Sequence, residues 1–274
     1  MSTKHYSSNW ERYWSDVNDA GLSIMWDVAP EDGVGLDWPN FSGRLDRELP
    51  LLHLGCGHGR QTKFFSRHFE RVIGADISYS AIGRARREHD ADNIEYRQID
   101  GLDHHQARHL HAEIGDTNVF VRAVMHQLEE VDQPRFLRSA LELIGDRGVL
   151  HLTELHSRSL GLFRPLTRLK VGVFGELKTV LDHDISPHGV DPERIESIID
   201  TDTYEILRNG PCIAARKHLG LLSIPVDVKG WSMTIRKRRP SHTSYVGLPA
   251  PAAHASGSMS MSVSASSSVS MPIL

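Results

Sequence analysis

The chain has 274 residues, of which 24% are charged, and a formal net charge of −4 at pH 7 with neutral histidines. This slightly acidic balance gives no indication of nucleic acid or an anionic membrane as a partner. The two cysteines, Cys56 and Cys212, do not suggest a disulfide framework, and no signal-peptide core or membrane-length apolar run is present, so we expect a cytoplasmic protein.

The first forty residues are rich in tryptophan and tyrosine. Trp10, Tyr13 and Trp14 recur at i, i+3 and i+4, which predicts a short helix with one aromatic face. Such a face either packs on the core or forms a lid, in which aromatic rings lie beside a bound cation or flat substrate. Both roles can hold together.

A glycine-rich turn follows the first apolar strand, which we expect at 51–54. The turn contains Gly55, Gly57 and Gly59, and glycines let a backbone turn sharply and let a ligand approach it closely. A helix is predicted at 60–69. Strand, turn and helix together present unpaired backbone N–H groups to a small molecule.

Short apolar runs alternate with helical stretches up to residue 155. We expect the next strands at 71–76, 94–98, 118–123 and 148–155, and helices at 79–89 and 134–144. The last helix has Asp132 as its predicted cap and Gly145 as its stop. Strands separated by crossover helices predict a parallel sheet with right-handed connections.

Two further strands are expected at 203–207 and 231–237, and the absence of a long helix pattern between them predicts antiparallel pairing. The expected fold class is therefore α/β. It is a doubly wound, Rossmann-like sheet of seven strands, mostly parallel with an antiparallel last strand, and with helices on both faces.

Three regions are expected along the chain: an N-terminal aromatic helix or lid at 1–45, a main domain at 46–240 and a tail at 241–274. The main domain carries an irregular insertion at 157–200, which ends in a helix at 192–199 capped by Asp191. The tail is rich in Ser, Ala and Met and offers too little apolar surface to offset its ordering entropy, so we expect it to be disordered.

A parallel sheet binds ligands at the carboxyl ends of its strands, near the point where strand order reverses. We expect the following residues along this rim: Gly55, Asp76, Asp100, Arg122, His126, Glu154 and His156.

The spacing of the glycine turn disfavours a dinucleotide cofactor, because the third glycine of that fingerprint would stand at position 60, where the chain has Arg60. The chain instead resembles the class I S-adenosylmethionine-dependent methyltransferases of small-molecule type over roughly residues 10–237. The motifs that carry the resemblance are Leu-His-Leu-Gly-Cys-Gly-His-Gly at 52–59, Val-Ile-Gly-Ala-Asp-Ile-Ser at 72–78, Gln-Ile-Asp-Gly at 98–101, Asn-Val-Phe-Val-Arg-Ala at 118–123 and Gly-Val-Leu-His-Leu-Thr-Glu at 148–154.

The resemblance implies S-adenosyl-L-methionine as cofactor. Asp76 would accept hydrogen bonds from both ribose hydroxyls, Ile77 would pack on the adenine, and Asp100 would accept from the adenine amino group. A helix-capping Asp76 and an ordinary turn Asp100 are the alternatives. The full set of expected cofactor-binding residues is His53, Gly55, Cys56, Gly57, Gly59, Asp76, Ile77, Asp100, Gly101 and Arg122.

His53 departs from the family pattern, in which an acidic residue two positions before the first glycine helps to hold the cofactor's amino group. A neutral imidazole accepts one hydrogen bond but brings no negative charge. The departure implies a lower cofactor affinity, another acid in the same role, or a non-catalytic protein that keeps the fold.

The catalytic candidates at the rim are His126, Glu154 and His156. A base is needed only where the methyl acceptor must lose its proton at or before transfer. Structural packing is the alternative for His126, which follows the fourth strand.

The histidine cluster His104, His105, His109 and His111 lies among polar residues, as on a solvated helix, and we expect no metal there. The basic run at 236–239 is short and lacks interleaved aromatics, so it does not indicate a nucleic-acid surface.

The favoured function is methyl transfer from S-adenosylmethionine to a small-molecule acceptor by in-line displacement, without nucleic acid or membrane as partner. The alternatives are a non-catalytic S-adenosylmethionine-binding or regulatory protein and a different Rossmann-type enzyme.

Overall fold

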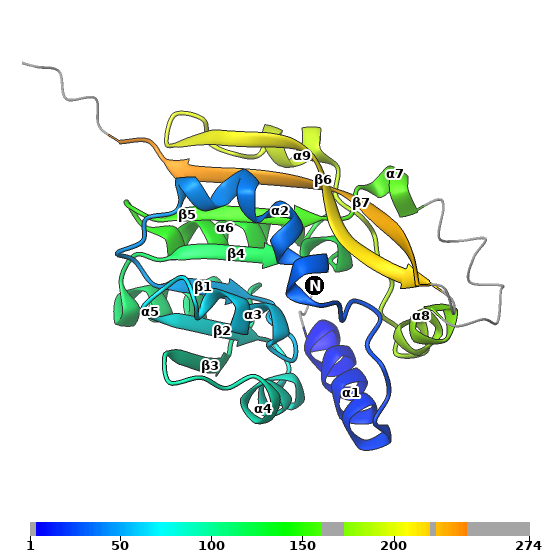
Figure 1. Cartoon of the computed structure of the whole chain (residues 1–274). Helices are drawn as coiled ribbons and strands as arrows, with labels where there is room; N and C mark the ends of the chain where they lie inside the picture. The colour runs from blue at the N-terminus through cyan, green and yellow to red at the C-terminus, as the bar shows by residue number, and fades with distance from the viewer. Residues whose placement is uncertain (1–3, 161–172, 220–222, 240–274) are drawn as a thin grey trace, which may run out of the picture. The chain divides into compact units, whose positions relative to one another are not determined.

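The protein is built on one seven-stranded sheet, seen in a computed structural model that describes residues 4–160, 173–219 and 223–239 (Figure 1). The strand order is β3-β2-β1-β4-β5-β7-β6. The strands are β1 (Leu51–Leu54), β2 (Val72–Asp76), β3 (Ile94–Gln98), β4 (Asn118–Arg122), β5 (Val149–Glu154), β6 (Tyr204–Leu219) and β7 (Ile224–Lys237). β1 to β5 pair in parallel, whereas β7 is antiparallel to β5 and to β6. The predicted fold class is confirmed.

Helices cover both faces of this sheet (Figure 1). They are α1 (Lys4–Ala20), α2 (Val34–Phe41), α3 (Arg60–Phe65), α4 (Tyr79–Glu88), α5 (His104–Ile114), α6 (Gln133–Ile144), α7 (Ser157–Leu160), α8 (Val173–Asp182) and α9 (Pro192–Ser197). Apolar side chains of α2 and α3 pack on one face of the strands, and those of α5, α6 and α9 pack on the other.

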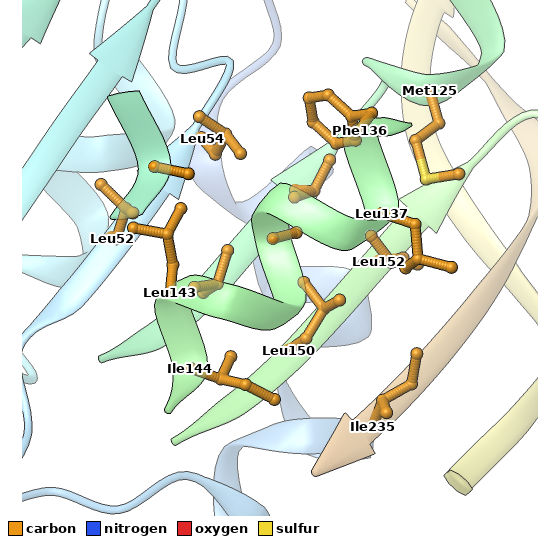
Figure 2. Packing of buried hydrophobic residues seen from close by; sticks show 14 of the residues in the cluster. Leu52, Leu54, Met125, Phe136, Leu137, Leu143, Ile144, Leu150, Leu152 and Ile235 are labelled. Carbon is orange, nitrogen blue, oxygen red and sulfur yellow. The ribbon is translucent and has the colours of Figure 1, made fainter. Parts of the chain in front are cut away.

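The larger core lies under α6, where leucines of β1 and β5 meet Phe136, Leu137 and Leu143 of the helix (Figure 2). Alternate residues of one strand point to opposite faces. Leu52 and Leu54 therefore belong to this core, whereas Leu51 packs on the α2 and α3 side. A sheet buried on both faces holds its carboxyl edge rigid, and that edge positions the site.

The N-terminal helix α1 packs its aromatic face on α4 and α8. Tyr13 and Trp14 are each 1% exposed and share a cluster with Val17, Ala81 of α4 and Val180 of α8. The predicted aromatic helix face is confirmed.

A carboxylate on α1 adds polar contacts to this packing. Glu11 accepts hydrogen bonds from the hydroxyls of Ser78 (2.7 Å) and Ser80 (2.6 Å) at the start of α4. Since Asp76 lies two residues before Ser78, α1 is fixed beside the end of β2.

A buried polar cluster of one α2 residue and two β5 residues fixes α2 to the sheet. Asp37 Oδ2 lies 2.8 Å from His151 Nε2 and accepts from the hydroxyl of Thr153, and all three side chains are buried. Burial opposes the ionised form, yet the hydrogen bonds from His151, Asn40 and Thr153 hold the pKa of Asp37 below its ordinary value.

Three predicted elements have wrong bounds, and one predicted cap makes no capping hydrogen bond. The helix predicted at 60–69 ends at Phe65. The strands predicted at 203–207 and 231–237 are the sheet ends of a long hairpin, β6 and β7, which continues to Leu219 and Ile224. Asp132 stands at the start of α6 but makes no capping hydrogen bond, because its carboxylate accepts from the hydroxyl of Tyr6 (3.1 Å) and from Arg135 instead.

Two predicted helix-end residues are confirmed, although the helix predicted at 192–199 ends at Ser197. Gly145 ends α6, and Asp191 caps α9 by accepting from Glu193 N (3.1 Å). Within the described ranges, no helix combines the length and the apolar character that crossing a bilayer requires. The predicted tail at 241–274 lies outside the described residues.

Candidate functional site

A pocket of about 980 Å³, counted to its open mouth, lies at the carboxyl ends of β1, β2, β3 and β4. Strand order reverses between β1 and β4, which is where sheets of this kind bind ligands. Except for Gly59, every residue expected to bind the cofactor lines it: His53, Gly55, Cys56, Gly57, Asp76, Ile77, Asp100, Gly101 and Arg122.

The glycine turn lines the pocket, and its positions 55 and 57 leave no room for a side chain. Gly55 and Gly57 have φ of +82° and +54°, which L-residues rarely adopt. A Cβ at position 55 would overlap Val124, and one at position 57 would lie 3.1 Å from the ring of Trp14. The backbone at this turn is therefore open to close approach by a ligand.

Gly59 and Cys56 serve the packing behind the turn. Gly59, with φ of +88°, precedes α3, and a Cβ there would lie 2.5 Å from Tyr96 Oη. The Cys56 thiol packs with Ile82 and Tyr96, and burial raises the pKa of this thiol well above its ordinary value. The thiol is thus unreactive, although Cys56 also lines the pocket.

Asp76 joins the end of β2 to the glycine turn. Its Oδ2 accepts from Gly57 N (2.8 Å) and its Oδ1 accepts from Ser78 N (3.0 Å). The cap of α4 is Ser78, whose hydroxyl accepts from Ala81 N, so the helix-capping alternative for Asp76 is wrong. Burial raises the pKa of Asp76. Each carboxylate oxygen has a second lone pair, so Asp76 can accept from a ligand as well.

The wall of the pocket next to Asp76 is largely apolar. Ile77 and Ile99 line it, and Gly101 lets the ring of Phe136 approach, since a Cβ at position 101 would lie 2.5 Å from that ring. Asp100 Oδ1 accepts from Leu102 N (2.9 Å), as a turn aspartate does, and the residue also lines the pocket. A flat, hydrogen-bonding ring suits such a wall.

His53 and Arg122 stand side by side at the ends of β1 and β4. His53 is buried, its Nδ1 lies 2.9 Å from Thr62 Oγ1, and burial together with the charge of Arg122 lowers the pKa of His53 to about 3. Burial lowers the pKa of Arg122 to about 10, which leaves a cation at neutral pH. The guanidinium donates through Nε and Nη2 to Ala214 O of β6 (3.1 and 2.9 Å).

The neutral His53 predicts acid destabilisation. Its pKa is about 3 in the folded protein against 6.5 unfolded, so its contribution is complete above pH 6.5 and is lost as the pH falls towards 3. From pH 7.5 to pH 5.0 we expect His53 to lower the free energy of unfolding by about 2 kcal/mol. Urea denaturation at the two pH values measures it.

The matched comparison for this prediction uses His53→Gln and His109→Gln, since His109 is exposed on α5. His53→Gln should remove about 2 kcal/mol of the pH dependence, and His109→Gln should retain it. An unaltered pH dependence in His53→Gln would show that His53 is not the group that titrates.

His126 and Glu154 meet behind the pocket and do not line it. Glu154 Oε1 accepts from Val124 N (3.0 Å) and Met125 N (2.9 Å), and its Oε2 accepts from His126 N (3.2 Å) and lies 2.7 Å from His126 Nδ1. The carboxylate thus holds the turn after β4, in which Ala123 has the strained φ of +59°.

His126 in turn orients a residue of the pocket wall. Its Nε2 lies 2.9 Å from Gln127 Nε2. With His126 Nδ1–H donating to Glu154, the bare Nε2 accepts from the Gln127 amide, whose Oε1 is left without a hydrogen-bond partner among the described residues. His156 lies away from the pocket, where its Nδ1 accepts from Arg158 N (3.0 Å).

Sequence reasoning missed several residues of the wall. Asp27, His58, Arg60 and Gln127 all line the pocket, and so does Tyr6 of α1. No ligand-binding role is predicted for Asp27, and its contact with His58 of the glycine turn places it at the pocket. Gln127 could have been suspected from its place directly after His126.

The histidines of α5 make local ion pairs. His111 Nε2 lies 2.9 Å from Asp116 Oδ1, and His104 Nε2 lies 3.9 Å from Glu142 Oε2. Across residues 4–160, 173–219 and 223–239, no three His, Cys, Asp or Glu side chains group as metal ligands do.

Comparison with protein families gives one match, which covers β1 to β4 and the helices between them. A family described as a methyltransferase domain matches residues 51–148, which span the glycine turn, β2, β3 and β4. A search of curated proteins gives no significant match.

Solved structures resemble the chain along most of its length. An S-adenosylmethionine-dependent methyltransferase from Anabaena variabilis is 33% identical, with 85% of this chain and 95% of that chain covered and a TM-score of 0.78. The N-methyltransferase NodS from Bradyrhizobium japonicum, in complex with S-adenosyl-L-homocysteine, is 15% identical, with 84% and 100% covered and a TM-score of 0.54. The second likeness concerns the fold alone.

Proposed function

The chain belongs to the S-adenosylmethionine-dependent methyltransferases, and we propose that it transfers the cofactor's methyl group to a small-molecule acceptor by in-line displacement. When bound, the cofactor supplies a methyl group activated by a positively charged sulfonium. In-line displacement asks the protein chiefly for positioning and exclusion of water.

The pocket fits such a cofactor in shape and in charge. The backbone at Gly55 and Gly57 forms a cradle that a Cβ would fill, and buried polar atoms of Asp27, His58 and Gln127 lack hydrogen-bond partners among the described residues. The wall carries three carboxylates and two guanidinium groups: Asp27, Asp76, Asp100, Arg60 and Arg122. This excess of negative charge complements a ligand with one net positive charge.

The observation that carries the proposal is the joint position of Asp76 and Asp100 beside the glycine turn in one pocket. We assign Asp76 to the ribose hydroxyls, Ile77 to the adenine face and Asp100 to the adenine amino group. The charge-assisted hydrogen bonds of Asp76 are among the stronger contacts such a site can make.

A second hollow, which shares Tyr6, Trp10 and Gln127 with the cofactor pocket, supports a small-molecule acceptor. It holds about 410 Å³, counted to its mouth, and α1 forms one wall of it. A space of this size suits a small molecule. In this arrangement α1 and the segment after it act as the lid expected for residues 1–45.

We assign a positioning role to His126 and Glu154. Neither lines the pocket, but they fix the amide of Gln127, which does. The Gln127 Oε1 can accept from an N–H or O–H group of the acceptor and so orient its lone pair. His156 remains a predicted catalytic candidate without a contact to the pocket.

Calorimetric titration with S-adenosyl-L-homocysteine, in parallel with NADH, tests the cofactor assignment. We expect heat with the first ligand and none with the second. Transfer of a radiolabelled methyl group from S-adenosylmethionine to a panel of amines, phenols, thiols and carboxylic acids then tests the reaction. Binding without transfer to any acceptor would favour the non-catalytic alternative that His53 raises, and absence of binding would contradict the proposal.

A further inference from the structure

The end of the pocket beside His53 lacks the anion that a carboxylate on β1 would supply. His53 is neutral in the folded protein, and its neighbour Arg122 is a cation. An amino-acid group carries an ammonium and a carboxylate together. Arg122, at the end of β4, can pair with the carboxylate of such a group. The ammonium of the group needs an anion that does not come from these strands.

Asp27 places an anion in the same pocket from outside the sheet. It lies between α1 and α2, in a segment that Gln61 of α3 fixes by donating to Val28 O (2.9 Å) and accepting from Val34 N (3.0 Å). Although burial opposes ionisation, neighbouring His58 and Arg60 lower the pKa of Asp27. The carboxylate is therefore charged at neutral pH and held against the glycine turn.

The hydrogen bonding of Asp27 is incomplete. Its Oδ1 lies 3.2 Å from His58 Nε2 and 3.0 Å from Arg60 Nε. Neither Asp27 Oδ1 nor His58 Nε2 has a hydrogen bond of good alignment to any described residue. A buried carboxylate oxygen without a well-aligned hydrogen bond lowers the stability of the folded protein unless a ligand donates one.

Arg122 has hydrogen-bonding capacity left as well. Among the described residues it donates to Ala214 O through Nε and one Nη2 hydrogen, which leaves three of the five N–H groups of a guanidinium. Asp27 and Arg122 line the same pocket.

We propose that Asp27 binds the ammonium and Arg122 the carboxylate of the cofactor's amino-acid portion, with Asp27 in the role that position 53 has lost. The inference rests on the proposed use of S-adenosylmethionine and specifies how one end of it is recognised. Since Asp27 comes from the segment after α1, the part of the chain that covers the pocket also completes the cofactor site.

The test compares two ligands in isothermal titration calorimetry. S-Adenosyl-L-homocysteine has the amino-acid group, and 5′-methylthioadenosine has the same nucleoside and thioether without it. We expect Asp27→Asn to raise the Kd for S-adenosylhomocysteine about tenfold or more and to change the Kd for methylthioadenosine less than about twofold. Arg122→Met should show the same selectivity.

Asp32→Asn is the matched control, because Asp32 lies on the same segment, pairs with His218 (3.2 Å) and does not line the pocket. It should leave both affinities unchanged. Thermal unfolding shows whether each variant is folded. If Arg122→Met is unstable, the test of the proposal rests on Asp27→Asn alone.

Three results would overturn the inference. Equal weakening of both ligands by Asp27→Asn would show that Asp27 merely holds the segment in place. Equal affinity of the unmodified protein for the two ligands would show that the amino-acid group is not recognised, while the cofactor assignment stands. Binding of neither ligand would overturn the cofactor assignment as well.

Discussion

Replacing Asp76 with alanine is expected to raise the Kd for S-adenosyl-L-homocysteine by at least about a hundredfold. Two charge-assisted hydrogen bonds to the ribose would be lost, each contributing about 1.5–3 kcal/mol. The substitution also removes the acceptor for Gly57 N, so the glycine turn loses its tie to β2. Isothermal titration calorimetry at constant pH measures the change.

Asp103→Asn is the control for this prediction. Asp103 caps α5 near the same edge of the sheet, where it accepts from His105 N and Gln106 N, but it does not line the pocket. We expect it to leave both the stability and the affinity nearly unchanged, because Asn caps a helix about as well as Asp does. A change of less than about threefold in Asp76→Ala would contradict the ribose role.

Glu154→Gln is expected to lower the free energy of unfolding by about 2–3 kcal/mol, because hydrogen bonds from N–H groups to a buried, charged carboxylate contribute about 1.5–3 kcal/mol. Glu154 accepts from three backbone N–H groups of residues 124–126 and lies 2.7 Å from His126 Nδ1. The glutamine amide would turn an N–H group towards one of these donors, which leaves it unsatisfied. Urea denaturation at pH 7.5 measures the loss.

The same variant should also weaken ligand binding at the pocket, because Ala123 and Val124 line the pocket and Glu154 fixes the turn that carries them. Glu193→Gln, an exposed substitution on α9, serves as control and should cost less than about 0.5 kcal/mol. A loss below about 1 kcal/mol in Glu154→Gln would mean that the strained turn does not depend on this carboxylate.

The first five strands could be predicted within one residue at each end because their signals are local. Each is a short apolar run that a glycine, a cap or a crossover helix delimits, as at β1 before Gly55 and β2 before the helix that Ser78 caps. The full length of the β6–β7 hairpin could not be predicted, because its outer half is only partly buried and therefore has no apolar pattern. Pairing of the two strands stabilises this half. Pro211 reads as a strand breaker but is tolerated in β6, which is an edge strand.

Within the site, the motif residues could be predicted from spacing, since Asp76 is the last residue of β2 and Asp100 lies two residues after β3. His126 and Glu154 were expected at the same rim, and adjacency of β4 and β5 does bring them together. Their burial behind the pocket depends on how the turn after β4 folds back, which no periodicity encodes. The pairing of Asp37 with His151 across 114 positions is equally invisible in the sequence.

The crowding of tryptophans around the glycine turn gives the protein an optical property of its own. Trp10, Trp14 and Trp26 all line the pocket, and the rings of Trp10 and Trp14 each lie close to that of Trp26, with centroids 5.4 and 6.2 Å apart. Trp231, by contrast, is buried in the core and bonded to Asn209. Three of the five tryptophans therefore report on the ligand's surroundings, so occupancy can be followed by fluorescence without any added label.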